Sequence, residues 1–233
     1  MIQSFPILDV WAEAVADRLA GALAGALAAD GRALFAGSGG STPSPIYARL
    51  AQADLDWAKV TTTLVDERYV SETSPDSNAT LLKGALLTGP AAAARFIPLY
   101  SPAVTVDRAA VLASRALDAE GRPLDAVLLG MGEDGHICSM FPGSPTLTTL
   151  LTPSLKPAVY GVPAGRDGAA PPQERLTLNL PWLASARCVV LALTGAKKRA
   201  VFEREAAGDP AVSPIAALIA ANAPLEVFWT EAD

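Results

Sequence analysis

Side chains that bind metals or form disulfides are scarce in this sequence, which has one histidine and two cysteines among 233 residues. Cys138 and Cys188 lie far apart and in no Cys-x-x-Cys pair, so we expect free thiols and no disulfide framework. With a single histidine, a metal site would depend on carboxylates, and we expect none. Imidazole is the side chain that ordinarily titrates near neutral pH, so acid–base chemistry at that pH would centre on His136.

Basic charge and long apolar runs are also missing. The formal net charge is −6 at pH 7, which argues against nucleic acid as a partner because phosphate backbones select basic surfaces. No apolar run reaches the roughly 18 residues that a membrane span needs. The apolar stretch 20–29 follows Asp9, Glu13 and Asp17 in place of a basic leader, so it predicts a packed helix and no secretory signal. We expect a cytoplasmic protein with no membrane partner.

Hydrophobic side chains are abundant, at 51% of residues, and allow a large buried core. Apolar residues recur at helical spacing over 9–29. The strands that we expect are 33–36, 60–65, 95–99, 124–129, 158–162, 175–178, 188–193 and 225–229. The helices that we expect between them are one entered at Pro43 and Pro45, then 77–87, 106–119, 197–207 and 214–221. This alternation predicts a single α/β domain over 1–233, with a doubly wound, mainly parallel sheet and helices on both faces.

The segment after the first of these strands suits an anion. In an open parallel sheet, ligands bind at the carboxyl ends of the strands, and here the sequence is Gly37-Ser38-Gly39-Gly40-Ser41-Thr42-Pro43. Glycines let backbone amides approach an anion closely, and hydroxyls can complete a phosphate cradle. The third glycine of the dinucleotide motif and the Gly-Lys-Ser/Thr of a P-loop are both absent. A plain strand-to-helix turn is the alternative interpretation.

Charged residues follow other strands. Asp66-Glu67-Arg68 comes after 60–65, and Gly130-Met131-Gly132-Glu133-Asp134-Gly135-His136 comes after 124–129. Each alone is typical of a solvated turn, but a histidine in a glycine-rich loop beside two carboxylates suits a general base. Arg175 and the segment Gly195-Ala196-Lys197-Lys198 add cations near further strands. Together these segments predict a sugar-phosphate site.

In these blocks the chain resembles the 6-phosphogluconolactonases, within the larger group that includes glucosamine-6-phosphate deaminases. The matching blocks, in the family's order, are 39–43, 66–68 with Ser77-Asn78, 130–136 with Phe141-Pro142-Gly143, Pro171-Pro172-Gln173-Glu174-Arg175-Leu176-Thr177, and 195–198. The resemblance implies a Rossmann-like sheet and hydrolysis of 6-phospho-D-glucono-1,5-lactone to 6-phospho-D-gluconate, in the oxidative branch of the pentose phosphate pathway. It implies no metal or organic cofactor. The expected partner is the sugar phosphate lactone, and we expect a monomer or a weak dimer.

The resemblance also implies catalytic roles. His136 would be the general base, and Asp66 and Arg68 would assist it. The imidazole needs a carboxylate to set its tautomer, and Asp66, Glu133 and Asp134 all remain candidates. Backbone amides of the glycine-rich loops, or Arg68, would stabilise the oxyanion that forms from the lactone carbonyl.

Substrate binding is implied for a second set of residues. It consists of Gly39, Gly40, Ser41, Thr42, Arg68, Gly135, Arg175 and Lys198. Lys198 matches the family better than Lys197, because it lies three residues after Gly195.

Two other functions are open alternatives. The segment Ile137-Cys138-Ser139-Met140 departs from the Thr-Ala-Ser-Leu that is common in lactonases, and an isoleucine there also occurs in the deaminase branch. Against a glucosamine-6-phosphate deaminase stand Arg68, where that branch has tyrosine, and Phe141-Pro142-Gly143, where it has Asn-Glu-Pro. A non-catalytic sugar-phosphate sensor usually carries a DNA-binding extension, for which we expect no room in this chain.

We predict that His136→Ala lowers kcat for the lactone about 10²- to 10⁴-fold, the usual contribution of a general base. A lactone is an activated ester, so a positioned water and one base near neutral pKa suffice for its hydrolysis. An assay coupled to a dehydrogenase that consumes 6-phosphogluconate measures the rate. A folded variant with unchanged kcat would remove His136 from the mechanism.

Overall fold

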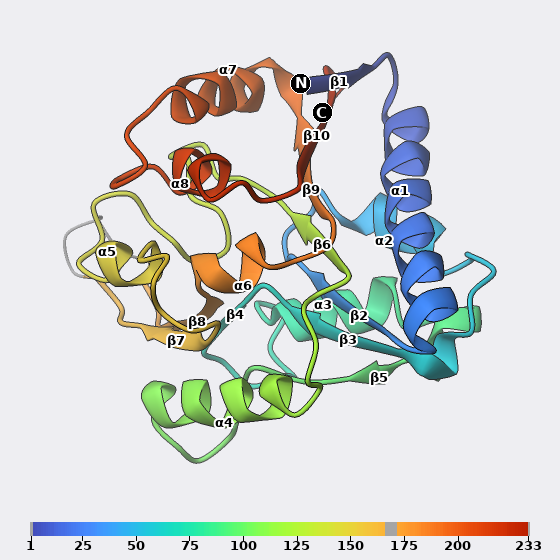
Figure 1. Ribbon diagram of the computed structural model, residues 1–233, viewed down its shortest axis with the longest axis horizontal. Helices are drawn as coiled ribbons and strands as arrows, with labels where there is room; N and C mark the ends of the chain where they lie inside the picture. The colour runs from blue at the N-terminus through green and yellow to red at the C-terminus, as the bar shows by residue number, and fades with distance from the viewer. Residues whose placement is uncertain (1, 166–171, 233) are drawn as a thin grey trace.

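Seven parallel strands form the central sheet in a computed structural model that describes residues 2–165 and 172–232 (Figure 1). Across the sheet their order is β1 (Ile2–Phe5), β10 (Leu225–Thr230), β9 (Val189–Thr194), β6 (Ala126–Leu129), β2 (Ala33–Gly37), β3 (Val60–Leu64) and β5 (Arg95–Phe96). The four middle strands are buried along nearly their whole length. Such burial is typical of a parallel sheet that is covered on both faces.

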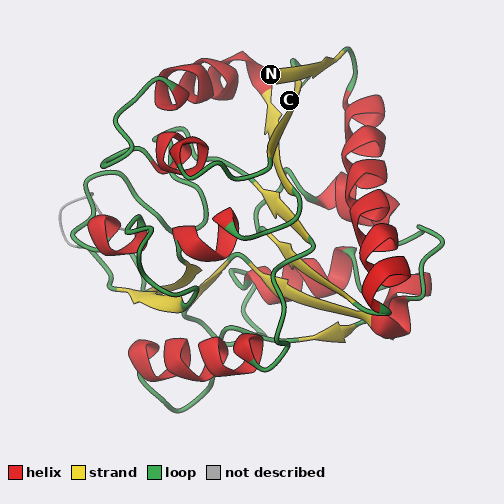
Figure 2. Ribbon diagram, in the orientation of Figure 1, coloured by secondary structure: helices red, strands yellow, loops and turns green. Residues whose placement is uncertain are grey.

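Helices cover both faces, as the sequence predicts (Figure 2). On one face lie α1 (Leu8–Asp30), α2 (Ser44–Leu50) and α3 (Asn78–Ala85), and on the other lie α6 (Leu180–Ala184), α7 (Gly195–Ala206) and α8 (Pro214–Ala220). The buried side of α1 presents Trp11, Val15, Leu19 and Leu23 at successive turns. No helix in the described part of the chain is long and apolar enough to cross a membrane.

A second, three-stranded sheet departs from the predicted parallel pattern. It consists of β4 (Asp66–Arg68), β8 (Arg175–Leu178) and β7 (Val159–Val162), and both of its pairings are antiparallel. Helix α4 (Val106–Asp118) packs against β7 and β8. The charged segment 66–68 is a strand because β8 pairs with it, a contact between distant parts of the chain.

The remaining elements are short. They are α5 (Leu147–Leu150) and the 3₁₀ helices Trp57–Lys59 and Gly89–Ala93. The sequence did not predict β1, β4, α5 or α6, because segments of three to five residues carry too little periodicity. The predicted longer elements are present, with ends that differ by a few residues.

The order of the strands places a crevice between β2 and β6. From β2 the chain proceeds outward through β3 and β5, and it then crosses to β6 and proceeds outward through β9 and β10. Ligands of open α/β sheets bind at such a reversal, beyond the carboxyl ends of the strands. The segments after β2, β3, β6 and β9 all begin at this edge.

A buried ion pair joins β2 and β6 at their amino ends. The side chain of Asp125 is fully buried. Its Oδ2 accepts a hydrogen bond from Leu34 N at 2.7 Å, and its Oδ1 lies 2.8 Å from Arg122 Nη2. The Arg122 side chain is itself 6% exposed. Arg122 also pairs with Asp30 at 3.0 Å, and Arg187 Nη1 lies 3.2 Å from Asp125 Oδ1, so a small network of opposite charges compensates the buried pair.

We predict that Asp125→Ala lowers the free energy of unfolding by about 3–5 kcal/mol, because it removes the buried carboxylate partner of Arg122, leaving only the more exposed Asp30, and leaves the buried Leu34 N without its acceptor. The matched control is Asp56→Ala, which removes the partner of Lys59 in an exposed pair and is expected to cost less than about 1 kcal/mol. Urea denaturation measures both. Equal losses in the two variants would contradict the structural role of Asp125.

Candidate active site

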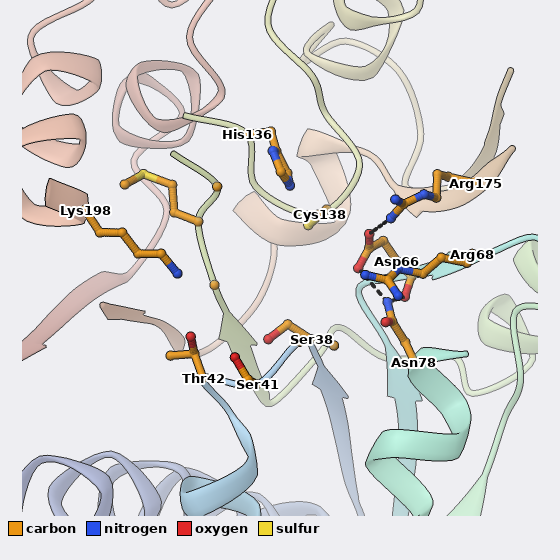
Figure 3. A pocket seen from close by; sticks show the side chains of 15 residues that line it. Ser38, Ser41, Thr42, Asp66, Arg68, Asn78, His136, Cys138, Arg175 and Lys198 are labelled. Atoms are coloured by element: carbon orange, nitrogen blue, oxygen red, sulfur yellow. Dashed lines mark hydrogen bonds and ion pairs between the residues drawn. The ribbon is translucent and has the colours of Figure 1, made fainter. Parts of the chain in front are cut away.

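A cavity of about 240 Å³ opens at the crevice (Figure 3). It is lined by Ser38, Gly39, Gly40, Ser41, Thr42, Asp66, Arg68, Asn78, Gly130, Met131, Gly132, His136, Cys138, Arg175 and Lys198. The set contains every residue to which the resemblance assigns a catalytic or binding role except Gly135, which precedes His136 in the chain. Glu133 and Asp134, the other candidates for setting the tautomer, are also outside it. Segments that are far apart in sequence therefore meet in one place.

The loop after β2 depends on two glycines. Gly40 has a φ of +91°, a conformation that glycine adopts without steric cost. A Cβ on residue 39 would lie 1.8 Å from Asn78 Oδ1, so the backbone approaches α3 as closely as glycine allows. The Tyr47 hydroxyl donates to Ser38 O at 2.6 Å and fixes the start of the loop. The loop thus presents Ser41 and Thr42 to the cavity (Figure 3).

Asp134 is the carboxylate that contacts the imidazole. His136 Nδ1 lies 2.6 Å from Asp134 Oδ1, and this hydrogen bond lowers the pKa of Asp134, which stays ionised at neutral pH. Glu133 instead pairs with Lys197. A Cβ on Gly132 would lie 2.3 Å from His136 Nδ1 and 2.4 Å from Asp134 Oδ1. Glycine at position 132 therefore makes room for the pair.

Asp66 binds neighbours other than the imidazole. Its Oδ2 accepts from Ser139 Oγ at 2.6 Å, and its Oδ1 accepts from Asn78 Nδ2 at 3.3 Å. Arg175 Nη1 lies 3.9 Å from Asp66 Oδ2. Asp66 thus connects α3, β8 and the loop 130–140 that carries His136, called here the histidine loop. The sequence alone does not identify Asn78 or Ser139 as site residues; the Ser77-Asn78 pair at the start of a predicted helix is the available signal for Asn78.

Glu67 is a structural neighbour of the cavity. Its buried carboxylate accepts from the backbone amides of Arg68, Asn78 and Ala79 and from Ser77 Oγ. Burial raises its pKa, and these hydrogen bonds oppose the shift. Amides at the start of a helix lack partners within the helix, so Glu67 completes the amino end of α3 and holds Asn78 in place.

Two arginines face each other on the small sheet. Arg68 and Arg175 are paired residues of β4 and β8, and Arg68 Nη1 donates to Asp76 O at 2.7 Å. Both Nε atoms are buried, and neither has a hydrogen-bond partner among the described residues. Burial lowers the pKa of Arg175, and Arg68 acts in the same direction while Asp66 opposes it. This concentration of positive charge suits an anionic ligand.

Lys198 faces the arginines from the opposite side of the cavity (Figure 3). Its neighbour Lys197 pairs with Glu133 instead. Within residues 2–165 and 172–232, no three histidine, cysteine or acidic side chains gather as a metal site requires. Of the predicted block 171–177, Pro171 lies outside the described residues.

Comparison with known proteins gives concordant matches. Residues 8–229 match the family described as glucosamine-6-phosphate isomerases/6-phosphogluconolactonase. A 6-phosphogluconolactonase of Rhizobium meliloti is 44% identical over 94% of this chain and 93% of its own length, and one of Pseudomonas aeruginosa is 40% identical over 95% and 94%. A crystal structure of a 6-phosphogluconolactonase from Shewanella baltica aligns with a TM-score of 0.90 and 33% identity, covering 99% of this chain and 97% of that one.

The deaminase branch is more distant. A monomeric glucosamine-6-phosphate deaminase aligns with a TM-score of 0.76 at 17% identity, covering 98% of this chain and 96% of that one. That likeness concerns the fold alone.

We predict that Asp134→Asn lowers kcat about 10- to 100-fold, the equivalent of one hydrogen bond to a charged group. The neutral amide can donate to Nδ1 and so favour the wrong tautomer. KM should stay near its original value, because Asp134 does not line the cavity. The control is Glu133→Gln, the adjacent carboxylate that pairs with Lys197. If both variants lose activity equally, the effect belongs to the loop and not to the pair.

Proposed function

The chain belongs to the glucosamine-6-phosphate isomerase/6-phosphogluconolactonase family, and we propose that within this family it is a 6-phosphogluconolactonase. It hydrolyses 6-phospho-D-glucono-1,5-lactone to 6-phospho-D-gluconate, a step in the oxidative branch of the pentose phosphate pathway. One observation in the site carries the proposal. The only imidazole of the chain, hydrogen-bonded to a carboxylate, shares a cavity with two arginines, a lysine and a loop of hydroxyls.

In this proposal the phosphate binds between Lys198, Arg175 and the loop 40–42. A phosphate dianion supplies several oxygen acceptors, and guanidinium groups match its geometry with paired N–H donors. The buried Nε atom of Arg175, which has no partner among the described residues, supports this role. Arg68 then faces the sugar ring.

His136 acts as the general base. The bond to Asp134 favours the tautomer with its proton on Nδ1, so the lone pair of Nε2 is free. Nε2 takes a proton from a water molecule while the water oxygen bonds to the carbonyl carbon C1. The carbonyl electron pair moves onto its oxygen, and the Arg68 guanidinium with backbone amides of the glycine-rich loops stabilises this oxyanion.

Collapse of the tetrahedral intermediate completes the reaction. The C1=O bond re-forms, the bond from C1 to the ring oxygen breaks, and the imidazolium returns its proton to that oxygen. The products are a hydroxyl on C5 and a carboxylic acid at C1, which ionises in water. Burial raises the pKa of the Cys138 thiol well above its ordinary value, so this thiol is protonated and is a poor nucleophile.

The proposal also covers the domain organisation, the oligomeric state and the compartment of the protein. Residues 1–233 act as one domain, as a monomer or weak dimer, on a small sugar phosphate lactone. Cys138 and Cys188 are unpaired and buried, which is compatible with the reducing cytoplasm.

The test of the function uses lactone generated in situ from glucose 6-phosphate and NADP⁺ with its dehydrogenase. A second dehydrogenase, which consumes 6-phosphogluconate, reports hydrolysis. We expect the wild-type protein to accelerate hydrolysis above the spontaneous rate and to release no ammonia from glucosamine 6-phosphate. A folded protein without acceleration would overturn the lactonase assignment, and ammonia release would favour the deaminase.

We predict that Lys198→Ala raises KM about 10- to 100-fold, since it removes a charged hydrogen bond to the phosphate. Lys197→Ala is the matched control, because this neighbouring lysine pairs with Glu133 and should leave KM unchanged. Steady-state kinetics on the lactone measures both. A normal KM in Lys198→Ala would place the phosphate elsewhere in the cavity.

A further inference from the structure

The histidine loop folds back on itself through a tight turn. Met140 N donates to Ile137 O at 3.0 Å, and Cys138 within the turn has a φ of +52°. Few residues other than glycine adopt this conformation, because their Cβ is crowded there. A costly conformation that persists must be held by its surroundings.

Buried hydrogen bonds hold the turn. Ser139 is fully buried. Its backbone N donates to Thr177 Oγ1 at 3.1 Å, and its Oγ donates to Asp66 Oδ2 at 2.6 Å. These bonds fix the turn to both β4 and β8. Because Phe141 directly follows this turn in the chain, the same bonds set the position of its ring.

Phe141 lies between the base and a cation of the substrate site. Its ring centroid is 4.4 Å from that of His136, with an angle of 38° between the planes. On Arg175, Cζ lies 5.9 Å from the same centroid, within the range of a cation–π contact. Phe141 does not line the cavity, so any effect on the reaction passes through these two neighbours.

We propose that Phe141 is a positioning residue, whose ring sets the plane of the His136 imidazole and supports the Arg175 guanidinium. The inference rests on the proposed function in that it gives His136 the role of the base. A single hydrogen bond to Asp134 sets the tautomer while the two side chains are aligned, but it leaves the imidazole able to turn about its side-chain bonds and out of that alignment. The ring of Phe141 restricts that rotation and keeps Nε2 directed for the attack of water, where small displacements are costly.

The test is Phe141→Leu, which keeps an apolar side chain and removes the aromatic face. We expect kcat to fall about 10- to 100-fold, because the base is misplaced. We expect KM to rise about 2- to 5-fold, because the contact with Arg175 is lost. Phe141→Tyr retains the aromatic ring, so its kcat should stay within a few-fold of the wild-type value. Phe96→Leu is the control, because Phe96 is also half-buried and faces a cation, Lys83, but lies on β5 at the edge of the central sheet, away from the His136 ring.

A spectroscopic measurement separates positioning from simple packing. Because the chain has one histidine, protein with ¹⁵N-labelled histidine gives imidazole signals that need no assignment. In Phe141→Leu we expect the ring-proton shifts to lose the ring-current effect of Phe141 and the Nδ1-protonated pattern to become mixed. Phe96→Leu and Phe141→Tyr should retain the wild-type pattern.

The outcomes distinguish this inference from the function on which it rests. An unchanged Nδ1-protonated pattern in a folded Phe141→Leu protein would overturn the positioning role, whatever its activity. Wild-type kcat in that variant would also overturn it. If wild-type protein fails to hydrolyse the lactone while the Nδ1-protonated pattern still becomes mixed in Phe141→Leu, the lactonase assignment fails and the orientation of His136 by Phe141 stands.

Discussion

Parallel pairing of β2 with β6 is the interaction on which the site depends. The two strands are distant in sequence, yet Phe35 pairs with Ala126 and Ala36 with Val127. This register sets the loop of hydroxyls beside the loop of the histidine at the same edge of the sheet. The pairs of β3 with β2 and of β9 with β6 then add the carboxylate segment on one side and the lysine helix on the other. A change in this register would separate the loops that line the cavity.

Close approach of backbone to side chain is the second constraint. Gly39 lies against the Asn78 amide, and Gly132 lies against the pair formed by His136 and Asp134. In both places any Cβ would overlap with polar atoms that take part in the site. The glycines therefore serve less as flexible links than as positions where absence of a side chain lets functional groups come together.

The cavity wall carries positive charge, although the protein as a whole is negatively charged. The protein has a net charge of −6, yet the cavity wall gathers Arg68, Arg175 and Lys198 with Asp66 as the one carboxylate among its lining residues. Two arginines at paired positions of neighbouring strands repel each other, and the backbone pairing of β4 with β8 holds them there. An anionic ligand between them would relieve that repulsion, so the same feature that weakens the fold locally would favour the binding of an anion.

Local signals in the sequence determined the longer elements and the strand ends at which the cavity forms. The helical spacing in 9–29, the short apolar strands and the glycine-rich segments depend on neighbours within a few positions. Such patterns can therefore be recognised in the sequence alone. Tertiary structure alone decided that 66–68 is a strand and that Asp134 rather than Asp66 or Glu133 contacts the imidazole. It also brought Phe141 between His136 and Arg175. These outcomes depend on the direction of side chains and on the pairing of segments about a hundred residues apart, which spacing along the chain does not encode.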